Sequence, residues 1–438
     1  MSGSKNYFYL LPPEVTQGIF NSVQAQEKPL LVPLSKHLLP FQQRPLFYHI
    51  VLDSYGDLEM LCDMTRKRSA LATYIDHLHI NIDPTFVPGQ EVPTESDDPL
   101  VPSSGQLQAL YQSLTNVTTL SIFCSHRLVT SILTQELTPD YFPKLHKLCL
   151  TSSFPQFEDP FDPAHYTVLP NLPKLKSFLL TVFCAPHAVR PNPQITTLTV
   201  PFSSQLENLR LCGPLMSSAS STKLLIESSS SITSLALIDT FGKSQVTELL
   251  DGLQRRDNLL ELTLDRSPVY GLIPLSSLVE ALSRCPNLQS LTLGGSCSST
   301  SPSLYSALLD LPLRSHIFSY DAQVSLDQLA RLVTGSTKHS TLRSMTFENL
   351  SGKIGTTIEE AGQPYAGPHG NGCDVYPDWI LPEWTEDFTR KGLIEFLKIA
   401  DFEGVHVEGF ALEAIRVEMA YERELDIIKA MGEDDYSE

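Results

Sequence analysis

The sequence predicts an α/β fold in which short strands alternate with helices, and two observations lead to this prediction. The first is a recurring pattern of three apolar residues, clearest at Leu288, Leu291 and Leu293. The last two have the spacing of a strand that points alternate side chains into a core. The second is the distance between most successive copies, which is 25 to 30 residues. This period is typical of leucine-rich repeats, so we predict a solenoid of strand–helix repeats with a parallel inner sheet.

The pattern recurs along most of the chain, usually after a segment rich in proline, asparagine or serine. Its clear copies begin at Ile75, Val117, Leu145, Leu175, Ile195, Leu206, Ile232, Leu259, Leu288 and Leu342, and a degraded copy lies near Leu313 and Phe318. The copies at Leu175, Ile195 and Leu206 are only 20 and 11 residues apart, so one of them is expected to fall outside the repeat. The alternative is an α/β domain in which the motifs occur by chance.

The segments between copies contain helical patterns with apolar residues on one face. They are residues 107–114, 246–253, 275–282 and 326–333. Each lies just before a strand copy, as a repeat of one helix and one strand requires. We therefore assign residues 61–350 to the solenoid, with a polar, proline-rich loop insertion at about 83–105.

Two further regions follow the solenoid. Residues 351–386 are rich in glycine and proline, and we expect a loop insertion that packs against the protein through both tryptophans of the chain. Residues 387–438 are predicted to form a strand and helix cap with an acidic tail. Within it, helical patterns cover 388–400 and 410–431, and residues 405–407 are expected to add a last strand.

The first sixty residues are predicted to form a small helical module. Residues 11–15, Leu-Pro-Pro-Glu-Val, open a helix, because proline is tolerated in a first turn and glutamate favours the positive end of the helix dipole. With Ile19-Phe20, Leu34-Ser35-Lys36 and the segment 44–48, Arg-Pro-Leu-Phe-Tyr, this region resembles an F-box. Together with the repeats behind it, the chain looks like the fungal F-box proteins with degenerate leucine-rich repeats. It departs from that pattern at Phe47, where many F-boxes carry tryptophan.

The resemblance implies a function as well as a fold. The F-box would dock on the Skp-type adaptor of an SCF-type cullin–RING ubiquitin ligase, and the repeats would hold a target protein for ubiquitin transfer catalysed elsewhere. The implied adaptor-binding residues are Leu11, Pro12, Ile19, Leu34, Leu46 and Phe47. The alternative is a repeat scaffold or inhibitor without a ligase partner, in which residues 8–50 are the cap that covers the first apolar face of the array.

Composition and charge exclude several classes of partner. The formal charge of −19 argues against nucleic acid, because phosphate binding needs clustered lysine and arginine. Residues 351–438 hold 20 acidic and 7 basic residues, so a scaffold or inhibitor would attract a basic partner there. No apolar run approaches the length of a membrane helix, and the start of the chain lacks the apolar core of a signal peptide. The eight cysteines are scattered, which is typical of a reducing compartment, so we expect a cytoplasmic or nuclear protein.

Short motifs that could carry chemistry are better explained by structure. Residues 242–244, Gly-Lys-Ser, lack the glycine that a phosphate-binding loop needs five positions earlier. The pair at 77–79, His-Leu-His, supplies two of the ligands of a metal site but no third is indicated, so a solvent-facing strand pair explains it better, and the loop at 369–374 fits a plain turn. The basic run 66–68 is typical of a solvated helix face. We predict a protein without cofactor or catalytic group, and a hydrolase with its site in residues 351–386 is the remaining enzyme class.

The predicted solenoid offers a long surface for a macromolecule. Side chains between the buried strand leucines should stack side by side along the inner wall, although they come from distant repeats. The target-binding positions predicted in this way are His79, Ser121, Cys149, Arg210, Thr263, Thr292 and Thr346, with Ala236 in the same wall.

Overall fold

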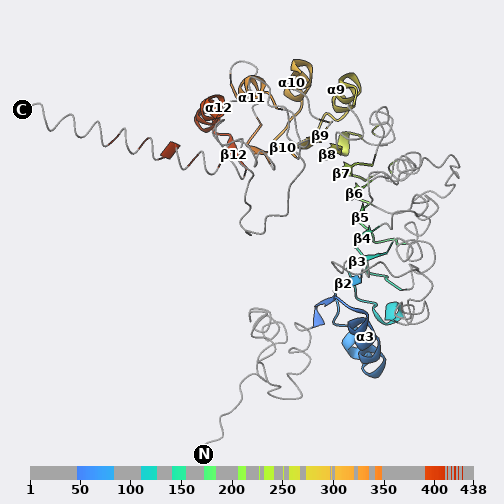
Figure 1. The fold of residues 1–438 in the computed structure, drawn as a ribbon. Coiled ribbons are helices and arrows are strands. Elements are labelled where there is room, and N and C mark those ends of the chain that lie inside the picture. Colours follow the sequence, from blue (N-terminus) through green and yellow to red (C-terminus); the bar gives the residue numbers. More distant parts are fainter. Residues whose placement is uncertain are drawn as a thin grey trace, which may run out of the picture. The chain divides into compact units, whose positions relative to one another are not determined.

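The computed structural model divides into two compact units, Met1–Ser230 and Ser231–Glu438 (Figure 1). It describes residues 47–82, 110–125, 141–153, 172–183, 206–213, 226, 231–240, 250, 256–266, 273–295, 297, 301–319, 324–334, 341–347, 390–409, 412, 416, 419, 420, 423 and 427. No helix within these residues is both long enough and apolar enough to cross a membrane.

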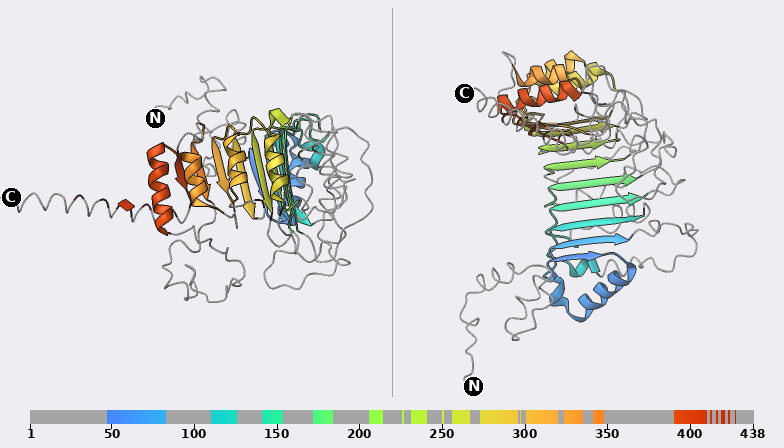
Figure 2. Two further views of the ribbon diagram at one scale, coloured as in Figure 1. Left: turned by 90° about the horizontal axis from the view of Figure 1, so that it is seen from above. Right: turned by 60° about the vertical axis from the view of Figure 1, so that its left-hand side comes forward.

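The first unit contains a parallel sheet whose strands follow one another in chain order (Figure 2). Its strands are β1 (His49–Leu52), β2 (His77–Ile82), β3 (Thr119–Ser125), β4 (Lys147–Ser153), β5 (Ser177–Phe183) and β6 (Asn208–Cys212). Between β1 and β2 lie the helices α3 (Tyr55–Lys67) and α4 (Ser69–Ala72). Ser54 caps α3, because its hydroxyl accepts a hydrogen bond from the Asp57 amide at 3.2 Å.

The second unit also contains a parallel sheet, and its described residues include a helix before each of β9 to β12. Its elements are β7 (Ser234–Ile238), the 3₁₀ turn η6 (Arg256–Asn258), β8 (Glu261–Arg266), α9 (Leu275–Ser283), β9 (Ser290–Gly295), α10 (Pro302–Leu309), β10 (Ser315–Phe318), α11 (Leu326–Val333), β11 (Ser344–Phe347), α12 (Arg390–Glu403) and β12 (His406–Glu408). The strand pairs from β7 to β12 are parallel and also follow chain order. Figure 1 shows α9 to α12 side by side on one side of these strands.

The register of the strands stacks equivalent residues of successive repeats. Leu120 lies opposite Leu78 on one neighbouring strand and Leu148 on the other, and Phe178 continues the row. In the second unit Leu262 and Leu291 lie in the same kind of row. Each of these side chains is at most 1% exposed. The leucine pattern therefore forms continuous buried rows, and the predicted leucine-rich-repeat solenoid is confirmed.

A repeated backbone bond sets this register. The carbonyl oxygen of Thr118 accepts hydrogen bonds from the amides of both His146 and Lys147, at 2.8 and 3.0 Å. The carbonyl of Leu260 does the same for Gln289 and Ser290, at 2.8 and 2.9 Å. Because the bond joins equivalent positions of adjacent repeats, neighbouring strands start at the same level.

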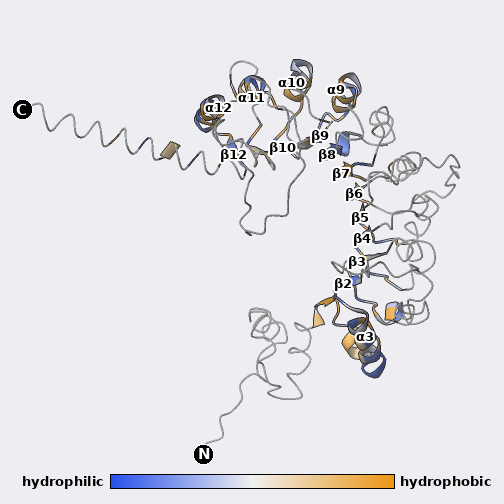
Figure 3. Cartoon of the chain, viewed as in Figure 1, coloured by the Kyte–Doolittle hydropathy of each residue, from blue (hydrophilic) through white to orange (hydrophobic). Residues whose placement is uncertain are grey.

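The helices of the second unit bury the apolar faces that their sequences define (Figure 3). In α11, Leu326, Leu329, Leu332 and Val333 are buried, and Ser325 caps the helix by accepting a hydrogen bond from the Gln328 amide. In α12, the buried residues are Leu393, Phe396, Leu397 and Ala400, as the sequence predicts. Helix α10 lies in a segment where we predicted no helix.

Two ambiguous copies of the pattern are resolved. Strand β5 pairs directly with β6, so the copy at Leu206 belongs to the sheet, and the copy at Ile195 lies outside the described residues. The degraded copy includes strand β10: its three buried positions are Leu313, which precedes the strand, and His316 and Phe318 within it. The last strand predicted at residues 405–407 is β12.

The N-terminal edge of the sheet differs from the expected repeat. Strand β1 pairs with β2 in parallel, although it lies within the predicted module 1–60, and α3 crosses the predicted boundary at residue 60. Residues 1–46 and the predicted loops 83–105 and 351–386 lie outside the described residues, so the F-box module and the loop insertions stay predictions.

Candidate binding surface on the sheet

The residues between the buried strand positions point to the other side of the sheet, which we call the open face. Its central row is formed by the residues that separate the two buried residues of each strand. In the first unit the row is Val51, His79, Ser121, Cys149, Leu179 and Arg210. In the second unit it is Ala236, Thr263, Thr292, Ile317, Thr346 and Glu408.

The structure brings together the residues predicted for the inner wall. His79, Ser121 and Cys149 are direct register neighbours on β2, β3 and β4, and Thr263 and Thr292 are neighbours on β8 and β9. Arg210 follows Leu179 in the central row of the first unit, and Thr346 follows Ile317 in the central row of the second unit. None of these seven side chains is buried. Their placement in rows is a property of the fold, and their binding role stays a prediction.

A second row lies two residues before the central one and is called the N-side row. It consists of His49, His77, Thr119, Lys147, Ser177 and Asn208 in the first unit. In the second unit it consists of Ser234, Glu261, Ser290, Ser315, Ser344 and His406. The predicted binding positions did not include this row.

The third row, two residues after the central one, is called the C-side row. Its members are Asn81, Phe123, Thr151, Thr181 and Cys212 in the first unit, and Ile238, Asp265 and Gly294 in the second. Asp265 accepts a hydrogen bond from the Ser319 hydroxyl at 2.5 Å. An added Cβ at Gly294 would collide with the Asp265 carboxylate, so only glycine leaves room for that side chain.

The open face of the first unit carries positive charge. The exposed side chains of Lys147 and Arg210 stand on β4 and β6, and no strand position of the three rows from β1 to β6 holds aspartate or glutamate. Carboxylates border the face but each has a local partner. Asp53 accepts a hydrogen bond from Asn81 at 3.3 Å, and Glu207 forms an ion pair with Lys176 at 2.8 Å.

Histidines cluster at the β1 end of the same face. The rings of His49 and His77 lie edge to face with centroids 6.0 Å apart, and Tyr48 meets His77 at 5.0 Å. His77 Nε2 is also 3.2 Å from Asp76 Oδ2. Within the described residues no group of three or more His, Cys, Asp or Glu side chains could hold a metal ion. The cluster therefore offers hydrogen-bond donors and ring surface to a partner.

Cys149 lies among these residues without the character of a nucleophile. Burial raises the pKa of its thiol, and the nearby Lys147 ammonium opposes that shift only in part. The thiol is therefore protonated at neutral pH, whereas nucleophilic attack by cysteine requires the thiolate. We interpret Cys149 as a small, weakly polar element of the binding surface.

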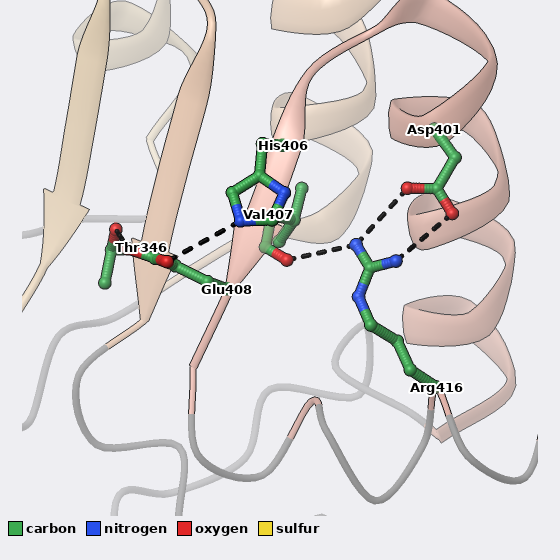
Figure 4. Close-up of polar contacts among 6 residues, drawn as sticks. All are labelled: Thr346, Asp401, His406, Val407, Glu408 and Arg416. Carbon is green, nitrogen blue, oxygen red and sulfur yellow. Dashed lines mark hydrogen bonds and ion pairs between the residues drawn. The ribbon is translucent and has the colours of Figure 1, made fainter.

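The open face of the second unit is acidic and rich in hydroxyl groups. Glu261, Asp265 and Glu408 lie in its three rows, and no strand position of these rows from β7 to β12 holds lysine or arginine. At the last strand, Thr346 Oγ1 donates a hydrogen bond to Glu408 Oε1 at 2.8 Å, and His406 Nε2 lies 3.6 Å from Glu408 Oε2 (Figure 4).

Arg416 fixes the last strand to the helix that precedes it. Its guanidinium donates hydrogen bonds to both carboxylate oxygens of Asp401 on α12, at 3.2 and 3.3 Å (Figure 4). It also donates to the carbonyl of Val407 on β12, at 3.0 Å. This arrangement gives a partner to a backbone acceptor at the edge of the sheet, where unpaired groups invite association with other strands.

The remaining candidate residues are distributed as follows. Among the six predicted adaptor-binding residues, Phe47 is described; it is partly exposed and one residue, Tyr48, separates it from β1, while the other five lie outside the described residues. Arg66 and Lys67 lie on an exposed face of α3 and form ion pairs with Asp63, at 3.4 and 3.7 Å. Residues 242–244 and 369–374 lie outside the described residues.

Comparisons with known proteins give matches among solved structures. No family model matches the sequence, and no curated protein matches it. Among solved structures, the yeast Rad7–Elc1 complex is 12% identical with a TM-score of 0.38, and the match covers 77% of this chain and 88% of that one. The leucine-rich-repeat-containing protein LegL7 from Legionella pneumophila is 18% identical with a TM-score of 0.34, and the match covers 61% and 81%. The fold assignment rests on the strand register and the buried rows described above.

Proposed function

We propose that this chain is the target-recognition subunit of an SCF-type cullin–RING ubiquitin ligase. The observation that supports the proposal most is the direct succession of two features along the chain. The segment that resembles an F-box, residues 8–50, runs without a linker into β1, which starts at His49 and is the first strand of the sheet. The open face of that sheet supplies a target-binding surface.

This succession has a mechanistic consequence. A ligase subunit without a catalytic group accelerates ubiquitin transfer only by holding the target at a suitable distance and orientation. Because Phe47 and β1 are separated by a single residue, an adaptor that contacts Phe47 would lie next to the first strand of the sheet in the first unit. A flexible linker would give up part of that advantage.

Co-purification with the Skp-type adaptor tests the proposal. The full chain should form a stable complex, and the variant Leu11→Ala/Pro12→Ala should lose it while keeping the thermal unfolding profile of the wild type. A matched control, Arg66→Ala/Lys67→Ala on α3, should bind the adaptor normally. If the folded wild-type chain forms no complex, the proposal fails and residues 8–50 are better explained as a cap of the repeats.

A second candidate function has separate support. The chain could serve as a repeat scaffold or inhibitor without a ligase partner, because residues 351–438 carry 20 acidic against 7 basic residues and would attract a basic protein. Such binding should weaken strongly between low and physiological salt, since exposed charges are screened over about 10 Å at 0.1 M salt. Basic partners captured by the full chain at low salt, together with failure to bind the adaptor, would favour this function.

A further inference from the structure

We infer that the open face of the first unit binds an acidic peptide segment of the target protein. The inference deepens the target-binding role proposed above and rests on it, because it names the chemistry that the sheet would recognise. The observation behind it is the separation of charge on the sheet. A chain with a formal charge of −19 places two exposed cations on β4 and β6, and the carboxylate of Asp53, which follows β1 in line with the C-side row, accepts a hydrogen bond from Asn81 at 3.3 Å.

The two cations are free to meet an external anion. Lys147 and Arg210 have no ion pair with a carboxylate among the described residues, whereas two bases nearby have polar partners. Lys176 is paired with Glu207 at 2.8 Å, and Lys144 donates a hydrogen bond to the Asn116 side chain at 2.7 Å. Charge complementarity therefore favours a ligand with carboxylates opposite Lys147 and Arg210.

The spacing of the cations specifies the ligand further. Lys147 and Arg210 are two strands apart across the sheet and, from the register, two residues apart along it. With strands about 4.8 Å apart and a rise of about 3.3 Å per residue, this corresponds to about 12 Å between their Cα atoms. An extended peptide covers that distance with two acidic residues three or four positions apart. Leu179 and Ser177 of β5 lie between the cations, so an apolar residue between the two acids would contact Leu179.

The surrounding residues suit a peptide backbone. His49 on β1 and His77 and His79 on β2 can each donate a ring N–H to a carbonyl. Asn208, two residues before Arg210 on β6, has both donor and acceptor groups. In the C-side row, Phe123 on β3 offers apolar surface and Thr151 on β4 offers a hydroxyl group. The face of the second unit also carries hydroxyl groups, but its three rows hold the carboxylates of Glu261, Asp265 and Glu408, which would repel the same peptide.

The net charge of the chain affects how the binding is measured. At low salt the net negative charge of the protein repels an acidic ligand while the local cations attract it, and added salt screens both, so the affinity alone would vary weakly with salt. Reversing the charge of individual side chains isolates the local contribution. The control must therefore change the net charge of the protein by the same amount at another place.

The experiment uses the full chain without adaptor, so that failure of the inference and failure of the ligase proposal are distinguishable. Fluorescence anisotropy should detect binding of a labelled twelve-residue peptide in which two glutamates, three or four positions apart, flank a leucine. The Lys147→Glu/Arg210→Glu variant should bind at least about tenfold more weakly, as should a peptide with glutamine in place of both glutamates. The control variant Arg66→Glu/Lys67→Glu, on α3, should stay within about twofold of the wild type.

Two results would overturn the inference. The first is equal affinity of the wild type and the Lys147→Glu/Arg210→Glu variant, or of the acidic and the glutamine peptide. The second is that the acidic peptide binds only after removal of residues 433–438, Glu-Asp-Asp-Tyr-Ser-Glu. In that case the occupant of the face is the acidic tail of the chain itself, and the assignment to a partner is wrong.

Discussion

The two units have the same buried rows but opposite chemistry on their open faces. In the first unit Lys147 and Arg210 stand among histidines and hydroxyls, and in the second Glu261, Asp265 and Glu408 stand among serines and threonines. Burial explains the likeness, because every strand must place its alternate side chains in the same core. The open face has no such requirement, so its residues can differ between repeats and give each unit its own partner chemistry.

The largest expected effect tests whether position in the pattern, rather than residue type, decides stability in the first unit. Phe178 on β5 is fully buried, whereas its neighbour Leu179 points to the open face. We expect Phe178→Ala to lower the free energy of unfolding by about 3–5 kcal/mol, through lost contacts and a cavity. Leu179→Ala should cost less than about 1 kcal/mol. Chemical denaturation of both variants checks this, and similar losses would contradict the assignment of the two faces.

A second prediction concerns the one position where the second unit departs from the leucine pattern within the described strands. His316 lies in the core next to Phe318, and its Nδ1–H donates a hydrogen bond to the Leu291 carbonyl at 2.9 Å, while Nε2 has no partner among the described residues. Burial lowers the pKa of His316 to about 4 from its ordinary value of 6.5. The folded protein therefore excludes a proton that the unfolded chain binds below pH 6.5.

The sign of the pH effect follows from this difference. As the pH falls from about 6.5 to about 4, protonation of the unfolded chain should cost the fold about 3 kcal/mol, and the loss should level off below that range. His316→Leu removes the effect and restores the apolar residue of the repeat. We expect the variant to lose less stability than the wild type between pH 7 and pH 4.5 in denaturant titrations. Parallel pH profiles for the two proteins would show that His316 does not have this role.

The smallest predicted effect compares two glycines, one on the open face and one on a helix. Gly294→Ala places a methyl group against the Asp265 carboxylate and should lower stability by about 1–3 kcal/mol. Gly56→Ala in α3 meets nothing closer than Ser54 Oγ at 3.7 Å and should raise stability by about 0.5 kcal/mol, because alanine favours a helix. Thermal unfolding of both variants measures the difference. If Gly294→Ala leaves the stability unchanged, the Asp265 side chain moves away without a cost in free energy.

The leucine pattern predicted most of the buried rows, because its spacing reports which side of a strand faces the core. It missed β1, which carries no full copy, and α10, which begins at Pro302 and whose buried residues Leu304, Tyr305 and Leu308 stand among serines. It also left the middle residue of the degraded copy, His316, unrecognised, because a polar residue interrupts the apolar triplet. The structure of β1 and α10 and the burial of His316 depend on neighbours that are distant in the sequence.

The charge separation was harder to predict than the fold. Arg210 was among the predicted wall residues and Lys147 was not, because Lys147 lies one position before the first buried strand leucine of its copy. Only the strand register brings the two side chains to the same face, two strands apart. Sequence spacing identifies which residues point outward, and the register of distant repeats decides which of them meet.

The most direct test of this account is photo-crosslinking of the acidic peptide to the chain in complex with the Skp-type adaptor. The complex is captured through the adaptor, and the crosslinked residues are mapped by mass spectrometry. We expect labels on β4 to β6 in the captured fraction, and their loss in the Lys147→Glu/Arg210→Glu variant. Labels on β7 to β12 instead, or a labelled chain that never accompanies the adaptor, would contradict it.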